Sequence, residues 1–257
     1  MNEFDNFLEN NNLYDVIFED KEYNHVLEAF RTARLSEQLR NNLRKYLQVM
    51  TKPLAVRSSG LFEDSLNQPF AGVYSTYLLP NNHPDIERRL EDVENAIKLV
   101  FASIYSPESR AYFNAIDYMI EEEKMAVIIQ EVIGNEHNGR YYPEISGVAQ
   151  SYNFYPFSYI QPEDGFAVTA IGLEAYVVGG EKTHSFSPTY PKLQLASTQD
   201  KIKASQRYFY GVNMLAQDYD LYRDGEKTGK TLPSKHTTSQ KPSVTAHWNT
   251  PLPFTTS

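Results

Sequence analysis

Cysteine is absent from the 257 residues, so the chain forms no disulfide and offers no thiol nucleophile or thiolate metal ligand. It also has no stretch of about 18 or more apolar residues, which argues against a membrane span. Residues 1–12 are acidic and rich in Asn, and they lack the basic and apolar regions of a signal peptide. These absences predict a soluble, cytoplasmic protein.

Basic residues are scarce as well, because 24 Lys and Arg stand against 33 Asp and Glu for a net charge of −9. An acidic chain without a long basic run is a poor candidate for nucleic-acid binding, since neutralising phosphates requires clustered Lys and Arg. The six His residues are scattered, and no pair has the spacing of a zinc site. Hydrophobic residues make up 41% of the chain, which is enough for a sizeable core. The composition therefore predicts a globular protein with neither nucleic acid nor membrane as a partner.

The composition changes towards the C-terminus. Residues 225–257 contain four Lys and one Glu and are rich in Thr, Ser and Pro, without helical or strand periodicity. We expect residues 216–257 to be a tail that is either disordered or non-native, and both interpretations stay open. Residues 1–50 are predicted to be a helical segment that precedes a main domain at residues 51–215.

Hydrophobic patterns predict a mixture of helices and strands. Helical periodicity occurs over His25 to Met50, with Ser36 placed to cap the second half, over 86–104, from Pro107 to about Ile120, and over 198–212. Strand patterns occupy residues 54–58, 73–79, 125–133, 145–154, 165–173 and 181–186. Strands and helices in this order favour an α+β or α/β fold.

The segment at residues 55–72, AVRSSGLFEDSLNQPFAG, carries the most specific chemistry. It places Arg57, Ser58 and Ser59 at the end of an apolar strand, and Glu63 and Asp64 follow in the same loop. A guanidinium beside hydroxyls and backbone N–H groups suits an anionic cluster such as phosphate. The alternative is a capped turn in which Arg57 forms a salt bridge to Glu63 or Asp64. The residues by themselves leave both interpretations open.

This segment resembles the nucleotide-binding region of phosphoenolpyruvate synthase and pyruvate phosphate dikinase, through the string VRSSxxxED…FAGxxxTYL. Later pieces resemble the same family in the same order: VFASIYSPESRAY, AVIIQEVI, SGVAQS and GFAVTAIGLEAYVVGGE. The resemblance covers about residues 50–190. It implies an α+β domain of the ATP-grasp type, with mixed sheets and flanking helices, that binds ATP between two lobes.

The resemblance also assigns residues. Arg57 corresponds to the catalytic arginine that contacts phosphate, because its fixed fork can hold two oxygens while negative charge develops. The implied ATP site further contains Ser58, Ser59, Glu63, Asp64, Gly72, Gln130, Glu131, Val132 and Gly147. Glu63 and Asp64 are expected to order the loop or to orient Arg57. Residues 130–132 correspond to a hinge strand that reads the adenine edge, although a strand that turns Gln130 and Glu131 to solvent is the alternative.

Other features have simpler structural interpretations. The acidic run at residues 121–123 is typical of a solvated helix end. Gly147 is also compatible with an ordinary strand that makes a tight contact. Tyrosines are expected in core and lobe-interface packing, since no basic residues stand between them to form a nucleic-acid platform: Tyr141, Tyr142, Tyr152, Tyr155 and Tyr159.

The sequence also departs from the family pattern. Glu174 stands where the family has a Gly, and nothing before Lys52 resembles the family's glycine-rich segment with a phosphate-binding Lys. The family's magnesium-holding pair of acids has a weak counterpart in Asp218 and Asp220, because no Gln-x-Arg follows it here.

The resemblance implies ATP and Mg²⁺ as cofactors, with phosphoryl transfer from MgATP to a His on another domain. A phosphohistidine domain and a pyruvate/PEP-binding domain are the implied partners, in trans or in a longer parent protein, and the isolated chain is then a catalytically incomplete part of a dikinase. The alternative is a degenerate or truncated nucleotide-binding or regulatory module without catalysis. A carboxylate-amine ligase of the same fold is disfavoured by the RSS–ED motif.

Overall fold

The computed structural model describes residues 2–19, 22–63, 73–173, 183–193, 206, 209–215 and 219–224. These residues divide into two compact units, the first from Met1–Tyr142 with Gly211–Thr231 and the second from Pro143–Tyr210. The described residues of the first unit form helices and strands, whereas those of the second form mainly antiparallel strands. Helices together with small antiparallel sheets make an α+β fold, as the sequence predicts.

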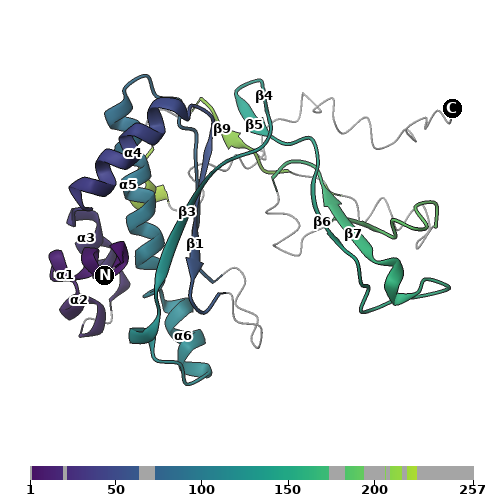
Figure 1. The fold of residues 1–257 in the computed structure, drawn as a ribbon, viewed down its shortest axis with the longest axis horizontal. Coiled ribbons are helices and arrows are strands. Elements are labelled where there is room, and N and C mark those ends of the chain that lie inside the picture. Colours follow the sequence, from purple (N-terminus) through teal and green to yellow (C-terminus); the bar gives the residue numbers. More distant parts are fainter. Residues whose placement is uncertain are drawn as a thin grey trace. The chain divides into compact units, whose positions relative to one another are not determined.

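The first unit carries the α-helices of the described residues and two of the described sheets (Figure 1). Its helices are α1 (Glu3–Asn10), α2 (Tyr14–Phe18), α3 (Tyr23–Thr32), α4 (Glu37–Val49), α5 (Ile86–Ser103), α6 (Pro107–Ala115), the 3₁₀ turn η1 (Ile120–Glu122) and α9 (Leu221–Asp224). One antiparallel sheet has the order β2-β1-β3, from β1 (Leu54–Gly60), β2 (Thr76–Leu79) and β3 (Met125–Glu131). The other has the order β4-β5-β9, from β4 (Asn135–His137), β5 (Arg140–Tyr142) and β9 (Val212–Asn213).

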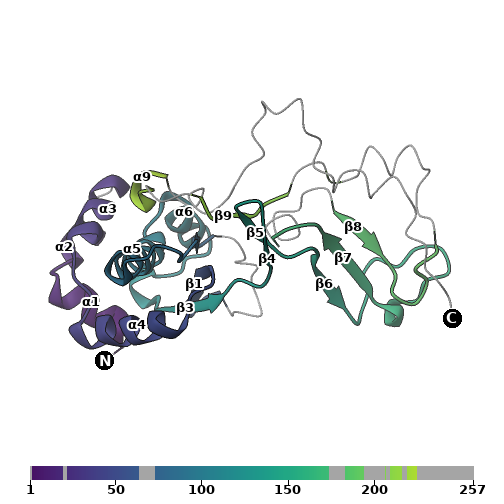
Figure 2. The ribbon, with the colours of Figure 1, turned by 90° about the horizontal axis from the view of Figure 1, so that it is seen from above.

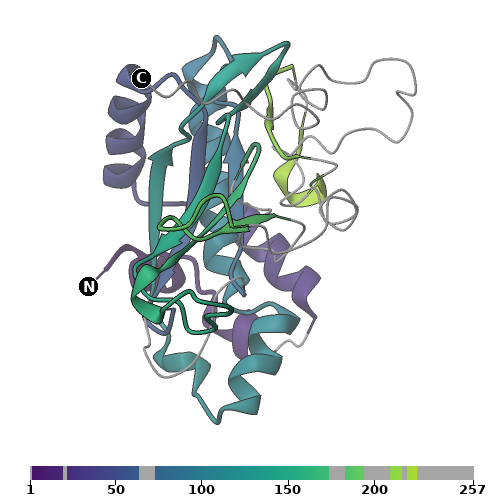
Figure 3. The ribbon, with the colours of Figure 1, turned by 90° about the vertical axis from the view of Figure 1, so that its right-hand side faces the viewer.

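The core of the first unit lies between the helices and one face of the sheet β2-β1-β3. Helix α5 packs against β1, and α3 and α4 pack against α5 (Figures 1 and 2). Residues from α1, α3, α4 and β1 join one buried cluster: Phe4, Phe7, Phe30, Leu47, Leu54 and Val56. Strands β1 and β3 run side by side as the longest antiparallel pair of this sheet (Figure 3). The helices of residues 1–50 therefore share their core with the sheet.

The predicted cap at Ser36 is confirmed, and the helical stretch from His25 to Met50 is divided there into α3 and α4. The chain is extended at Ala33, and Ser36 caps a new helix by accepting the backbone N–H of Leu39 at 3.1 Å. The ammonium of Lys98 on α5 donates to the carbonyls of Arg31 and Ala33 at 3.0 and 3.2 Å. This tertiary contact satisfies carbonyls that the helix end leaves unpaired.

Two further predicted helices end differently in the structure. The Ser-Pro start is confirmed, since Ser106 accepts the N–H of Ser109 at 3.1 Å, but α6 ends at Ala115 rather than near Ile120. A left-handed backbone at Asp117, with φ of +52°, follows that end. The helix predicted at 198–212 is wrong over its described end, where the chain is not helical and β9 pairs with β5. Residues 198–205 and 207–208 lie outside the described part.

The second unit contains a three-stranded antiparallel sheet of order β6-β7-β8. Its elements are β6 (Ser146–Gln150), the 3₁₀ turn η2 (Pro162–Asp164), β7 (Phe166–Ala170) and β8 (His184–Phe186). The connection from β6 to β7 exposes Tyr152, Tyr155 and Tyr159 by 45, 89 and 55%, so the expected core packing is wrong for these three. Tyr141 and Tyr142 of the first unit are buried as expected.

No helix among the described residues is long and apolar enough to cross a membrane.

Candidate functional site

The register of β1 and β3 places Arg57 and Gln130 on the same face of the first sheet. Arg57 lies opposite Ile128, and residues directly opposite each other in an antiparallel pair share a face. Gln130 is two residues further along β3 and returns to that face. The two residues are therefore diagonal neighbours, with their Cα atoms about 7 to 8 Å apart.

We call this side the open face, and alternation assigns it the following β1 and β3 residues: Ala55, Arg57, Ser59, Ala126, Ile128 and Gln130. Arg57, Ala126 and Gln130 are exposed, and Ile128 is 42% exposed. Val56 on the other side is buried in the core, and Val127 packs against that core. The sheet thus presents an apolar centre at Ile128, with a cation on one side and an amide on the other.

The guanidinium of Arg57 has no ion pair or hydrogen bond with any other residue in the part of the chain that the structure describes. Glu63 instead accepts the backbone N–H of Gly60 at 3.2 Å. Glu63 therefore orders the turn after β1, and the salt bridge that would have occupied Arg57 does not form with it. Asp64, the other predicted partner, lies outside the described residues.

The two serines after Arg57 point to opposite sides of β1. Ser58 is only 5% exposed and lies on the core side, so its hydroxyl does not share a face with Arg57. Ser59 is half-buried and belongs to the open face. The structure therefore brings Ser59, rather than Ser58, to the face of Arg57.

The predicted hinge residues have three different environments. Gln130 is exposed on the open face. Glu131 pairs with Lys52 at 2.5 Å, and this hydrogen bond raises the pKa of the Lys52 ammonium. Val132 is buried, and its backbone N–H donates to the carbonyl of Pro53 at 2.8 Å. Of the three, Gln130 is the one that presents its side chain to the open face.

The predicted glycines divide between the second unit and undescribed chain. Gly147 pairs with Thr169 in the second unit, where a Cβ would lie 2.4 Å from the carbonyl oxygen of Val168. Glycine is therefore required for β6 to approach β7, which is the tight strand contact considered above. Gly72 and Glu174 lie outside the described residues. A ligand role for Gly147 stays a prediction.

Asp220, a weak metal candidate, already has structural partners. One carboxylate oxygen accepts the N–H of Tyr222 at 2.9 Å, and the other lies 3.5 Å from the guanidinium of Arg31. Asp218 falls outside the described residues. Across the described ranges, no group of three or more His, Asp or Glu side chains is arranged to hold a metal ion.

Glu123 is a buried acid that sequence reasoning placed in solvent. Glu121 and Glu122 are exposed as expected, but Glu123 is only 2% exposed and the expectation is wrong for it. Its carboxylate accepts the backbone N–H of Phe62 and the hydroxyl of Tyr118, both at 3.3 Å. Burial raises the pKa of Glu123. The sequence pattern could have predicted this burial. Side chains alternate along a strand, and Glu123 is two residues before Met125, whose side chain points into the core.

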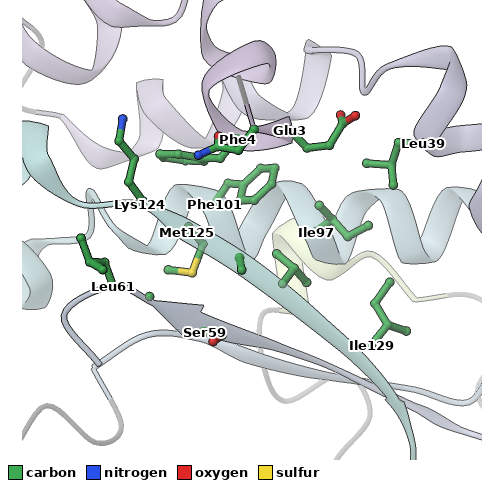
Figure 4. A pocket seen from close by; sticks show the side chains of 14 residues that line it. Glu3, Phe4, Leu39, Ser59, Leu61, Ile97, Phe101, Lys124, Met125 and Ile129 are labelled. Atoms are coloured by element: carbon green, nitrogen blue, oxygen red, sulfur yellow. The ribbon is translucent and has the colours of Figure 1, made fainter. Parts of the chain in front are cut away.

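A cavity of about 590 Å³ lies in the first unit, where α1 and α5 approach β3 (Figure 4). Its lining is largely apolar and includes Phe4, Ile97 and Phe101. The charged groups at its rim already have partners: Glu3 accepts the hydroxyl of Ser36 at 3.0 Å, and Lys124 pairs with Asp5 at 2.8 Å. Lys124 at this rim is thus already paired with a carboxylate, and Ser59 and Ala126 of the open face also line the cavity.

Sequence comparison identifies the family. The profile of the family described as pyruvate phosphate dikinase, AMP/ATP-binding domain, matches residues 2–240, and the chain belongs to this family. A phosphoenolpyruvate synthase from Aeropyrum pernix is 28% identical over 131 residues. The matched region is 51% of this chain but only 14% of that protein, so the chain spans a small part of its relative.

Proposed function

We propose that this chain is an ATP-grasp nucleotide-binding domain that holds ATP on the open face of the sheet β2-β1-β3. The observation that carries the proposal is the position of Arg57: its guanidinium has no protein partner in the described chain and shares a face with Gln130. Membership in a family of AMP/ATP-binding domains supports the same ligand.

In this proposal each end of the open face binds a different part of the nucleotide. The Arg57 guanidinium holds phosphate oxygens in a bidentate contact, and the Ser59 hydroxyl adds a donor beside it. The apolar side chain of Ile128 contacts the sugar or base, and the Gln130 amide hydrogen-bonds the base edge. Glu63 acts indirectly by holding the turn after β1.

The chemistry we propose is phosphoryl transfer from ATP to a His on another domain. Catalysis by this domain would consist of positioning the triphosphate and of stabilising the charge that develops on it. Mg²⁺, when bound, would neutralise part of the phosphate charge. The described residues supply no cluster that could hold the ion by itself, so we expect the metal to bind through the ATP phosphates.

The acceptor His and the pyruvate- or PEP-binding site would belong to other domains of a longer parent protein or to separate chains. The small share of the Aeropyrum pernix protein that this chain matches supports such a division. A second candidate function is nucleotide binding without transfer, in a regulatory module. This second candidate is favoured by Glu174, because the dikinase family has a Gly at that position.

Calorimetric titration of the purified chain with ATP, with and without Mg²⁺, tests the proposal. Arg57→Ala should weaken binding by about 1.5–3 kcal/mol, the range for a hydrogen bond to a charged group. Arg34→Ala is the matched control, because Arg34 is an exposed arginine outside the open face. Unchanged affinity in a folded Arg57→Ala variant would remove Arg57 from the site. ATP binding without hydrolysis or transfer, even with a supplied phosphohistidine domain, would favour the second candidate.

A further inference from the structure

Glu123 lies beside the turn that follows β1, the strand that carries Arg57. It contacts Phe62 of that turn, although the two residues are 61 positions apart in the chain. Its two carboxylate oxygens have different partners, Oε1 with the N–H of Phe62 and Oε2 with the hydroxyl of Tyr118. No cationic side chain in the described part of the chain pairs with it; the neighbouring Lys124 pairs with Asp5. A buried carboxylate held only by neutral donors is costly and needs every hydrogen bond it makes.

The turn after β1 is held through three consecutive backbone N–H groups. The N–H of Gly60 donates to Glu63 at 3.2 Å, that of Leu61 to the carbonyl of Lys124 at 2.9 Å, and that of Phe62 to Glu123 at 3.3 Å. Two of these acceptors, Glu63 and Glu123, are carboxylates. Two of them, Glu123 and Lys124, directly precede β3. The end of β1 is tied to the start of β3 beyond the last pair of the strand ladder, Gly60 with Met125.

Packing strengthens the same contact. The ring of Phe62 lies 4.8 Å from that of Tyr118, centroid to centroid, and 5.8 Å from that of Phe113. Tyr118 therefore touches Phe62 through its ring and Glu123 through its hydroxyl. Tyr74, on the chain returning towards β2, closes the site from another side, because its ring would lie only 2.7 Å from a Cβ on Gly60. Burial, and then the charge of Glu123, raises the pKa of the Tyr74 phenol.

We infer that Glu123 is a positioning residue of the nucleotide site, whose carboxylate fixes the turn 61–63 so that β1 presents Arg57 and Ser59 to the phosphates in one orientation. This inference rests on the proposed function. Arg57 is only three residues before Gly60, so a displaced turn would shift the strand end that carries it. An apolar residue in place of Glu123 would fill the volume but would leave the Phe62 N–H without its acceptor.

The Glu123–Phe62 contact can be tested without ATP, by following the ¹⁵N-labelled chain by NMR as a function of pH. The Phe62 amide resonance should shift with a midpoint above the ordinary glutamate value, because the N–H reports directly on the carboxylate that accepts it. Glu123→Gln should abolish this titration, and Glu122→Gln, at the exposed neighbour, should leave it unchanged. A Phe62 amide that does not follow Glu123 would overturn the inference.

The positioning role is tested by ATP affinity. Glu123→Leu should weaken ATP binding about tenfold, the equivalent of one hydrogen bond near the top of the usual range. Glu123→Gln keeps an acceptor for Phe62 and should restore affinity to within about twofold of wild type, and Glu122→Gln should match wild type. Wild-type affinity in a folded Glu123→Leu variant would overturn the positioning role.

Two outcomes separate this inference from the proposed function. If the wild-type chain does not bind ATP, the proposed function and the positioning role both fail, whereas the Phe62 titration still decides whether the contact exists. If the Glu123→Leu variant does not fold, the positioning role is tested instead by amide hydrogen exchange of the wild-type chain with and without ATP. The amides of residues 60–62 should then gain protection when ATP binds, and unchanged protection would refute the positioning role.

Discussion

Gly60→Ala is the substitution for which the structure makes the sharpest prediction of stability. A Cβ at this position would lie 2.6 Å from the Glu123 carboxylate and 2.7 Å from the Tyr74 ring. Both distances are too short for carbon, and neither neighbour can move easily, since Tyr74 is 6% exposed and Glu123 is 2% exposed. Either the end of β1 must shift or the hydrogen bond between Glu123 and Phe62 must break.

Two opposing effects set the size of this change. Overpacking a tight site destabilises proteins by about 1–3 kcal/mol. Replacing Gly with Ala restricts the unfolded chain, which returns about 0.4–1 kcal/mol where the backbone tolerates Ala. Since two separate contacts are violated, we expect overpacking to dominate and the free energy of unfolding to fall by about 2 kcal/mol.

Urea denaturation followed by circular dichroism measures this change, provided that the slope of the transition stays constant. Ser59→Ala is the control, because Ser59 is the half-buried neighbour on the open face, and it should change stability by less than about 0.5 kcal/mol. A Gly60→Ala chain as stable as wild type would refute the described packing. In Gly60→Ala/Glu123→Ala one of the two clashes is removed, so the two effects should not add.

Two further predictions concern buried acids. Tyr219→Phe removes a 2.8 Å hydrogen bond to Asp92, whose side chain is 13% exposed, and should lower the free energy of unfolding by about 1.5–3 kcal/mol. A double-mutant cycle with Asp92→Asn measures the coupling energy of the pair. A coupling energy of zero would contradict the packing of residues 219–224 on α5. Burial raises the pKa of Glu123 above the ordinary 4.5, so the stability that its protonation contributes is fully present below pH 4.5 and is lost as the pH rises through the raised pKa. Glu123→Gln should therefore gain stability relative to wild type across that window in urea titrations at a series of pH values, and a difference that does not vary with pH would argue against a buried carboxyl.

Short-range features of this fold could be predicted from the sequence. Ser36 and Ser106 cap helices because a side-chain oxygen three residues before a free backbone N–H is a local arrangement. The strands at β1 and β3 follow from apolar and β-branched runs, although their ends differ by a few residues. The sequence predicted the start of α4 at Ser36 but not the end of α3. The contact of Lys98 with the carbonyls of Arg31 and Ala33 joins residues 65 to 67 positions apart.

The candidate site shows the same division. The residue types around Arg57 suit a phosphate site or a capped turn, and the resemblance to the dikinase family favours the phosphate site, which stays a prediction. Which of those residues share a face depended on the pairing of β1 with β3, which unites Arg57 with Ile128 and Gln130 and turns Ser58 into the core. The burial of Glu123, beside two exposed glutamates, was likewise decided by the packing of Phe62, Tyr74 and Tyr118 around it.

The sequence by itself therefore determined the family and the α+β class, since these reside in composition, periodicity and residue order. Tertiary structure alone decided the register that places Arg57 with Gln130 and the burial of Glu123. The physical reason is that strand register and burial arise from contacts between residues far apart in the chain, whose free energy is gained only when those residues meet.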